Sequence, residues 1–166
     1  EERLALLGEA ARLYGACGDA WNCAAAWAQL ASLHQRASLY NDALSAYREA
    51  VKAFEAGGDL AGACWARTGV GSALVSAGRP AEALPLLEDA MAQHARVGDS
   101  AARSYATAQV GAALLGLGDY QAAIARFLDA LALVAGDEKL CRERCLTLLQ
   151  LAQAYGELGL LDWAEE

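Results

Sequence analysis

The chain has 166 residues, 56% of them apolar, and a formal net charge of −8. This length is sufficient for one domain with a continuous core, and no apolar run approaches the roughly 20 residues that span a bilayer. The negative charge disfavours nucleic acid as a direct partner, because phosphate groups repel an acidic surface. We therefore expect one soluble module that does not insert into a membrane.

Cysteine usage indicates a reducing compartment. The number of cysteines is odd, their spacing is not that of a compact disulfide framework, and the chain is long enough to fold without covalent staples. We expect the thiols to be reduced, buried small hydrophobes and the protein to be cytoplasmic. The chain opens on acidic and basic residues and continues into an amphipathic pattern, without the pattern of a secretory leader. The cysteines are Cys17, Cys23, Cys64, Cys141 and Cys145.

A repeat of forty residues runs through the sequence. The dipeptide Gly-Asp occurs at 18–19, 58–59 and 98–99. A second marker keeps the same step, because alanine stands at positions 10, 50, 90 and 130. Two independent markers in phase predict repeated units, each too small to bury its own apolar face.

Each unit reads as two helices. In the stretch from Gly58 to Val97, two helical patterns are separated at Gly78-Arg79-Pro80, where glycine can end one helix and proline can begin the next. The Gly-Asp pairs link successive hairpins, since aspartate is a good N-cap. In chain order we predict helices over 2–16, 20–36, 40–56, 60–77, 80–96, 100–116, 120–134 and 138–157, and a further helix from about 161.

The resulting domain covers 1–166 and begins and ends within a hairpin. Its first helix is the second of a unit, and its last helix is incomplete, so both end helices would present apolar faces. Because arrays of this kind normally cover their ends, we expect a fragment of a longer array, or an array completed by a neighbouring chain. The units are 1–18 (partial), 19–58, 59–98, 99–137 and 138–166 (partial).

The small and aromatic positions of each unit resemble the tetratricopeptide repeat. The fullest copy consists of Val110-Gly111, Leu114, Gly118, Tyr120, Ala123, Phe127 and Ala130. Other copies depart from the pattern at Ser38, which replaces a glycine, and at Pro80, which replaces an aromatic residue. This resemblance implies an all-α fold, a right-handed α-solenoid of antiparallel helical hairpins. The forty-residue step is similar to that of the LGN, kinesin light chain and bacterial regulator forms, and the SNAP adaptors use similar hairpins.

The resemblance also implies a concave groove lined by the first helix of each hairpin. The expected contacts are small and apolar, with Trp65 and Tyr105 either as anchors for a partner or as packing residues. The cluster of lysine, asparagine and arginine that clamps a peptide carboxylate in some family members is missing, so we expect an apolar or mixed peptide. The predicted contact residues are Gln35, Arg36, Trp65, Thr68, Ser72, Tyr105, Ala108, Ala112, Leu149 and Gln153, with Ala28, Ser32, Val75, Leu115 and Glu157 on the same faces.

Catalytic and metal chemistry have little support in the sequence. Cys141 and Cys145 share a helix face, but two ligands do not make a metal site. His34 occupies the place of a packing aromatic residue, and His94 is predicted on a polar helix face. No nucleophile elbow or phosphate-binding loop is present, so we expect no catalytic residue, no metal, no cofactor and no enzymatic activity. The recurring arginines at 67, 103, 142 and 144 could form a ladder at the groove edge, but pairing with neighbouring acids is favoured.

Three functions remain open at this point. The first is a protein interaction scaffold or adaptor that binds a peptide or helix of a partner in the groove. The second is self-assembly through the uncapped end hairpins. The third is a regulatory or effector-sensing region of a larger multidomain protein.

Overall fold

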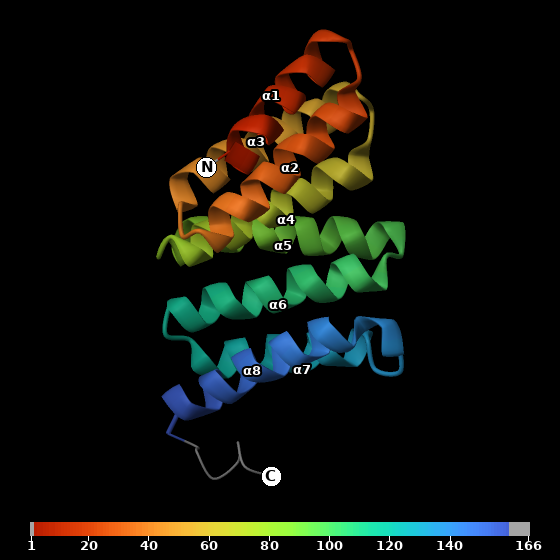
Figure 1. The fold of residues 1–166 in the computed structure, drawn as a ribbon. Coiled ribbons are helices and arrows are strands. Elements are labelled where there is room, and N and C mark those ends of the chain that lie inside the picture. The colour runs from red at the N-terminus through yellow and green to blue at the C-terminus, as the bar shows by residue number, and fades with distance from the viewer. Residues whose placement is uncertain (1, 160–166) are drawn as a thin grey trace. The chain divides into compact units, whose positions relative to one another are not determined.

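The chain folds entirely into helices over the described residues, 2–159 of a computed structural model, which contain no strand (Figure 1). This confirms the predicted all-α class, and most helix boundaries agree with the prediction within one residue. The helices are α1 Glu2–Ala16, α2 Ala20–Arg36, α3 Tyr40–Ala56, α4 Leu60–Ser76, α5 Pro80–Val97, α6 Ser100–Gly116, α7 Tyr120–Leu133 and α8 Cys141–Glu157, with a 3₁₀ turn η1 at Glu138–Leu140.

The Gly-Asp pairs act as the sequence predicts. Gly18 has a φ of 75°, a left-handed conformation that favours glycine. The carboxylate of the next residue, Asp19, accepts a hydrogen bond from the backbone N–H of Asn22 at 3.1 Å and caps α2. Hydrogen bonds from the Asn22 side chain and backbone lower the pKa of Asp19. The same capping bond recurs at Asp59, Asp99 and Asp119. Local chemistry therefore fixes where these helices begin.

The last described helix starts later than predicted. The sequence pattern indicated a helix over 138–157, but Asp137 caps the 3₁₀ turn η1 and α8 begins only at Cys141. α8 then has 17 residues, as do α2, α4 and α6. The residues of these four helices can therefore be compared by their position from the helix start. The helix predicted from about 161, with its Leu161, Trp163 and Ala164, lies outside the described residues.

The chain forms two compact units, one ending at Ala77 and one beginning at Gly78. In the first unit, α2 packs against α1 and α3, and α3 packs against α4. Alanine dominates this core and allows the helix axes to approach closely. Its central cluster consists of Ala24, Ala28, Ala50, Phe54, Ala63 and Ala66.

A glycine-to-ring contact joins α3 and α4 in the first unit. A Cβ atom placed on Gly69 would lie 2.5 Å from the Tyr47 ring, closer than real Cβ atoms approach. The Tyr47 ring also meets the Trp65 ring edge-on, with centroids 6.5 Å apart. Gly69 therefore sets how closely α4 approaches α3.

In the second unit, a glycine-to-ring contact joins α6 and α7, the two helices of one hairpin. The Ser104 hydroxyl donates to the backbone carbonyl of Ala130 at 2.8 Å. A Cβ atom placed on Gly111 would lie 2.8 Å from the Phe127 ring, which is fully buried. α8 packs on α7 and α6 and completes a cluster of Ala108, Ala123, Phe127, Ala130, Leu151 and Ala154.

Three of the cysteines are exposed, contrary to the prediction that they are buried. Cys23 and Cys64 lie in the core, and all five thiols are free. Cys17 lies in the turn after α1, where few neighbours cover it. Cys141 and Cys145 lie on α8, whose exposed side has no second helix packed on it among residues 2–159. The expectation of buried thiols therefore fails where no described helix packs on the helix face that carries the cysteine.

His94 is buried, so its predicted place on a polar face is wrong. It lies in the last turn of α5, forty residues from Phe54 and from Val134, and all three side chains are at most 7% exposed. The position of His94 in the repeat therefore determines its burial more strongly than do the polar residues beside it in the sequence. Burial lowers the pKa of His94, partly opposed by the Asp99 carboxylate.

We expect Gly69→Ala to destabilise the chain by about 1–3 kcal/mol, because the added methyl group would overlap the buried Tyr47 ring. A matched control is Gly8→Ala in α1, where the new Cβ would meet only Leu30 at an ordinary 3.8 Å. That change should stabilise by about 0.5–1 kcal/mol through helix propensity. Urea unfolding followed by circular dichroism measures both. Equal effects of the two substitutions would contradict the close-contact role of Gly69.

We expect the chain to lose stability as the pH falls below about 6.5, the ordinary histidine pKa. With a lowered folded-state pKa, His94 takes up its proton more readily when unfolded, so acid favours the unfolded chain until the folded-state pKa is reached. His94→Phe, which matches the buried Phe54, should reduce this loss. Thermal unfolding of both proteins at pH 7.5 and pH 5 tests the effect; an unchanged difference between the two pH values would refute it.

Candidate functional site

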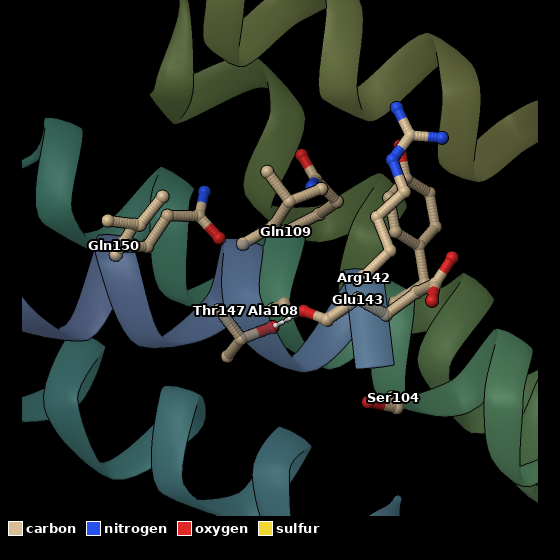
Figure 2. Close-up of a pocket in the computed structure, with 10 residues that line it drawn as sticks. Ser104, Ala108, Gln109, Arg142, Glu143, Thr147 and Gln150 are labelled. Carbon is tan, nitrogen blue, oxygen red and sulfur yellow. Dashed lines mark hydrogen bonds between the residues drawn. The ribbon is translucent and has the colours of Figure 1, made fainter. Parts of the chain in front are cut away.

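A pocket of about 460 Å³ opens in the second unit between the first helices α6 and α8 (Figure 2). Both helices place one side of their length on it, since lining residues recur every three or four positions. The lining residues are Ser104, Tyr105, Ala108, Gln109, Arg142, Glu143, Leu146, Thr147, Leu149 and Gln150.

Three large apolar side chains of the pocket are accessible to a ligand. Tyr105 is 38% exposed, Leu146 52% and Leu149 69%. Exposed leucines are individually common, but here two of them lie with an aromatic ring around one concavity. Such a surface can hold a large apolar side chain of a ligand.

The polar groups of the pocket gather at its two ends. Figure 2 shows Gln109 and Gln150 toward one end and Arg142 and Glu143 toward the other. Arg142 forms no ion pair with the residues that the structure describes, and neither amide has a hydrogen bond there that would hold it away from a ligand. These groups can donate to and accept from a peptide backbone.

Two hydroxyl groups of the pocket are already used by the fold. Thr147 donates to the backbone carbonyl of Glu143 at 2.9 Å, as the dashed line in Figure 2 shows. Ser104 donates to Ala130 on α7. These two side chains therefore shape the floor of the pocket, and its recognition groups are the amides, the charged pair and the apolar side chains.

The first unit presents a related face on α2 and α4. The Gln35 side-chain amide donates to the Ser72 hydroxyl at 3.0 Å and to the Ser76 hydroxyl at 3.2 Å, which ties the two helices together. Trp65, 44% exposed, lies on the same helix as both serines. This face thus combines one large aromatic ring with a pair of hydrogen bonds between the two helices.

One position of the first helices is large, apolar and exposed in both units. It is the sixth residue of each helix: Trp65 in α4, Tyr105 in α6 and Leu146 in α8, while α2 has the smaller Ala25. The preceding residue is buried in α4 and α6, at Cys64 and Ser104. A recurring exposed apolar residue next to a buried one is the pattern of a contact surface rather than of a core.

The predicted contact residues divide into exposed and buried groups. Tyr105, Ala108 and Leu149 line the pocket, and Gln35 and Ser72 bond to each other. Arg36 and Gln153 are exposed but lie outside the pocket, as does the half-buried Ala112. Thr68, Ser72 and Ala108 are buried, as is Ala28, although Ala108 also lines the pocket. Small residues at the ninth helix position, Ala28, Thr68 and Ala108, fill the contact between helices.

Several pocket residues were not predicted from the sequence. Leu146 is the clearest case, because its equivalence to Tyr105 depends on the start of α8 at Cys141, one residue later than the forty-residue step. An alignment of Thr147 with the buried positions of the other first helices would have revealed this displacement by one residue. The other unpredicted lining residues are Ser104, Gln109, Glu143, Thr147 and Gln150.

The arginines and histidines that the sequence singled out have different surroundings in the described part of the chain. Arg67 pairs with Glu55, as favoured from the sequence, whereas Arg142 lines the pocket and Arg103 and Arg144 form no ion pair within the described part of the chain. His34 is half-buried, and its Nδ1 atom has no hydrogen-bond partner among residues 2–159. Residues 2–159 contain no group of three or more potential metal ligands. None of their helices is long and apolar enough to cross a membrane.

Comparison with known proteins agrees with this geometry. A family profile described as tetratricopeptide repeat matches residues 22–96 and again residues 62–136, so the second match begins forty residues after the first. Two solved structures of nearly identical TPR-like repeats, from a protein of Podosopora anserina described as a kinesin light chain, share 20% sequence identity with the chain. One, a single-substitution variant, has a TM-score of 0.56 and covers 99% of this chain and 92% of its own. The other has a TM-score of 0.55, with coverage of 98% and 90%. No curated protein matches significantly.

Proposed function

This chain belongs to the tetratricopeptide repeat family, and on that basis we propose that it is a scaffold whose first-helix face binds a peptide segment of a partner protein. Repeats of this family generally act as protein interaction scaffolds, and stacked helical repeats offer extended surfaces for this purpose. The observation that carries the proposal is the pocket between α6 and α8, with Tyr105 and Leu146 exposed at its wall.

The chemistry of the pocket favours a peptide with one large apolar side chain as its anchor. Tyr105, Leu146 and Leu149 supply the apolar surface, and burial of an aromatic or aliphatic side chain there contributes most of the binding energy. The amides of Gln109 and Gln150 can pair with the N–H and C=O groups of the bound backbone.

A clamp for a terminal carboxylate is not favoured by this pocket. Its single arginine, Arg142, is followed directly by Glu143, which also lines the pocket. The acidic neighbour offsets much of the attraction that an isolated arginine would have for an anion. We therefore infer a mixed ligand, apolar at its anchor and polar along its backbone.

A cytoplasmic setting fits this scaffold. All five cysteines are free, and three of them are exposed. Exposed thiols persist in reducing compartments, where disulfides are rare.

The test is selection of binding peptides from a random library displayed on phage, followed by affinity measurement with the selected synthetic peptides. We expect the selected sequences to share a large apolar residue. Leu146→Glu should weaken their binding by about tenfold or more, because it places a charge in the apolar wall. Leu128→Glu on α7, an exposed leucine outside the pocket, is the matched control. Fluorescence polarisation gives both dissociation constants.

Two results would count against the proposal. One is unchanged binding of the selected peptides by Leu146→Glu and by the double variant Tyr105→Ala with Leu146→Ala. The other is a set of selected peptides that share no apolar residue. Circular dichroism of each variant separates loss of binding from loss of folding.

A further inference from the structure

The pocket between α6 and α8 carries two glutamines at equivalent helix positions. Gln109 is the tenth residue of α6, and Gln150 is the tenth residue of α8. Both side chains are half-buried, and both lie toward the same end of the pocket (Figure 2). Neither amide hydrogen-bonds to another residue within 2–159. Each therefore offers a ligand one carbonyl acceptor and two N–H donors.

Within residues 2–77, the first unit does not repeat this pair of available amides. The tenth residue of α2 is Gln29, but that of α4 is Gly69, where a side chain would meet the Tyr47 ring. The amide of Gln35, nearer the end of α2, is already bonded to two serines of α4. Two available amides at matched positions therefore distinguish the pocket of the second unit from the face on α2 and α4.

The two amides disfavour a helical ligand. The backbone groups of a helix are bonded to one another, so a docked helix presents only side chains. Side chains that cover Gln109 and Gln150 without bonding to them would remove water from both amides, which weakens binding. An extended segment leaves its own N–H and C=O groups unpaired, and these can bond directly to the glutamines.

The size and layout of the pocket agree with an extended ligand. One helical turn, 10–12 Å wide and 5.4 Å long, occupies about 420–610 Å³, so a pocket of about 460 Å³ holds roughly one turn. A helix docks through anchors on two or more turns. Here the apolar side chains lie between polar groups at both ends of the pocket. In an extended segment one anchor can point inward while the backbone on either side of it lies over those polar groups.

We propose that the pocket binds its ligand in an extended conformation, and that Gln109 and Gln150 hydrogen-bond to the ligand backbone on one side of the apolar anchor. This inference rests on the proposed peptide binding and adds the conformation of the bound segment. Gln109 and Gln150 then recognise the backbone of the ligand, and Tyr105 and Leu146 recognise its anchor.

A ligand recognised in this way has a distinct sequence pattern. Side chains over the glutamines can vary, but proline is excluded wherever a ligand N–H donates, because proline has no N–H. Proline is tolerated at the other positions, which the interior of a helical ligand would not allow. The ligand is a segment that is disordered in the free partner, since its backbone groups must be unpaired before it binds.

Amide-to-ester substitution along a peptide selected on the pocket tests the backbone bonds. Each ester removes one N–H and keeps the side chains. We expect one or two positions on one side of the anchor to lose about 2- to 10-fold in affinity, as loss of a hydrogen bond predicts. Fluorescence polarisation gives the dissociation constants.

Methionine variants assign those bonds to the glutamines. Methionine is unbranched like glutamine and forms helices equally well, but it has no amide. Gln109→Met and Gln150→Met should each weaken the unmodified peptide by about 2- to 10-fold, and the ester at the matching position should then add little. Gln29→Met, at the tenth position of α2 and outside the pocket, is the matched control and should change neither value.

A peptide held in a helix provides a second readout. A lactam bridge joins the residues two before and two after the anchor, which are neighbours on a helix and lie opposite the anchor. We expect it to weaken binding by about tenfold or more relative to the unbridged peptide with the same residues, because it removes the extended conformation. Equal or tighter binding of the bridged peptide would overturn the proposal.

The remaining outcomes separate this inference from the proposed function. Peptides that depend on Leu146 but bind both methionine variants unchanged would overturn the backbone recognition and leave the scaffold function intact. An ester effect that persists in full in both variants would also overturn it. Absence of any selected peptide that depends on Leu146 would overturn both proposals. Circular dichroism of each variant checks that the fold is retained.

Discussion

The close approach of neighbouring helices, both within a hairpin and between successive hairpins, is the constraint on which the rest of this structure depends. It requires a residue with little or no side chain on one helix wherever a ring lies on the other, as at Gly69 with Tyr47 and at Gly111 with Phe127. Packing of this kind gains many short dispersion contacts without burying unsatisfied polar groups. The alanine-rich core follows from it, because any larger residue at these positions would push the helices apart.

The same constraint separates structural from recognition residues on each first helix. A helix rotates by about 100° per residue, so consecutive residues lie on different faces. Ser104 is buried against α7, while Tyr105, the next residue, lines the pocket. Residues that face the hairpin partner are limited to small side chains, whereas residues that face the pocket can vary. One helix can thus change its ligand without changing its fold.

Helix positions were largely predictable from the sequence because their ends depend on local chemistry. Glycine in the left-handed region and an aspartate cap act within a few residues of each other, as at Gly18 and Asp19. Side-chain orientation was less predictable, because it depends on contacts between helices distant in sequence. Thr68 and His94 are polar residues that the fold buries, and the one-residue shift before Cys141 hid the equivalence of Leu146 and Tyr105.

The 3₁₀ turn before α8 shows where this architecture tolerates changes in length. The turn adds one residue between α7 and α8, yet Leu151 and Ala154 still reach the core as their counterparts do in α6. Each helix takes its rotational phase from its own start, so an extra residue in a connection is absorbed before the next helix begins. An extra residue inside a helix would rotate every later side chain by about 100°. Length variation among such repeats should therefore accumulate in the turns between helices, while first helices such as α2, α4, α6 and α8 keep 17 residues.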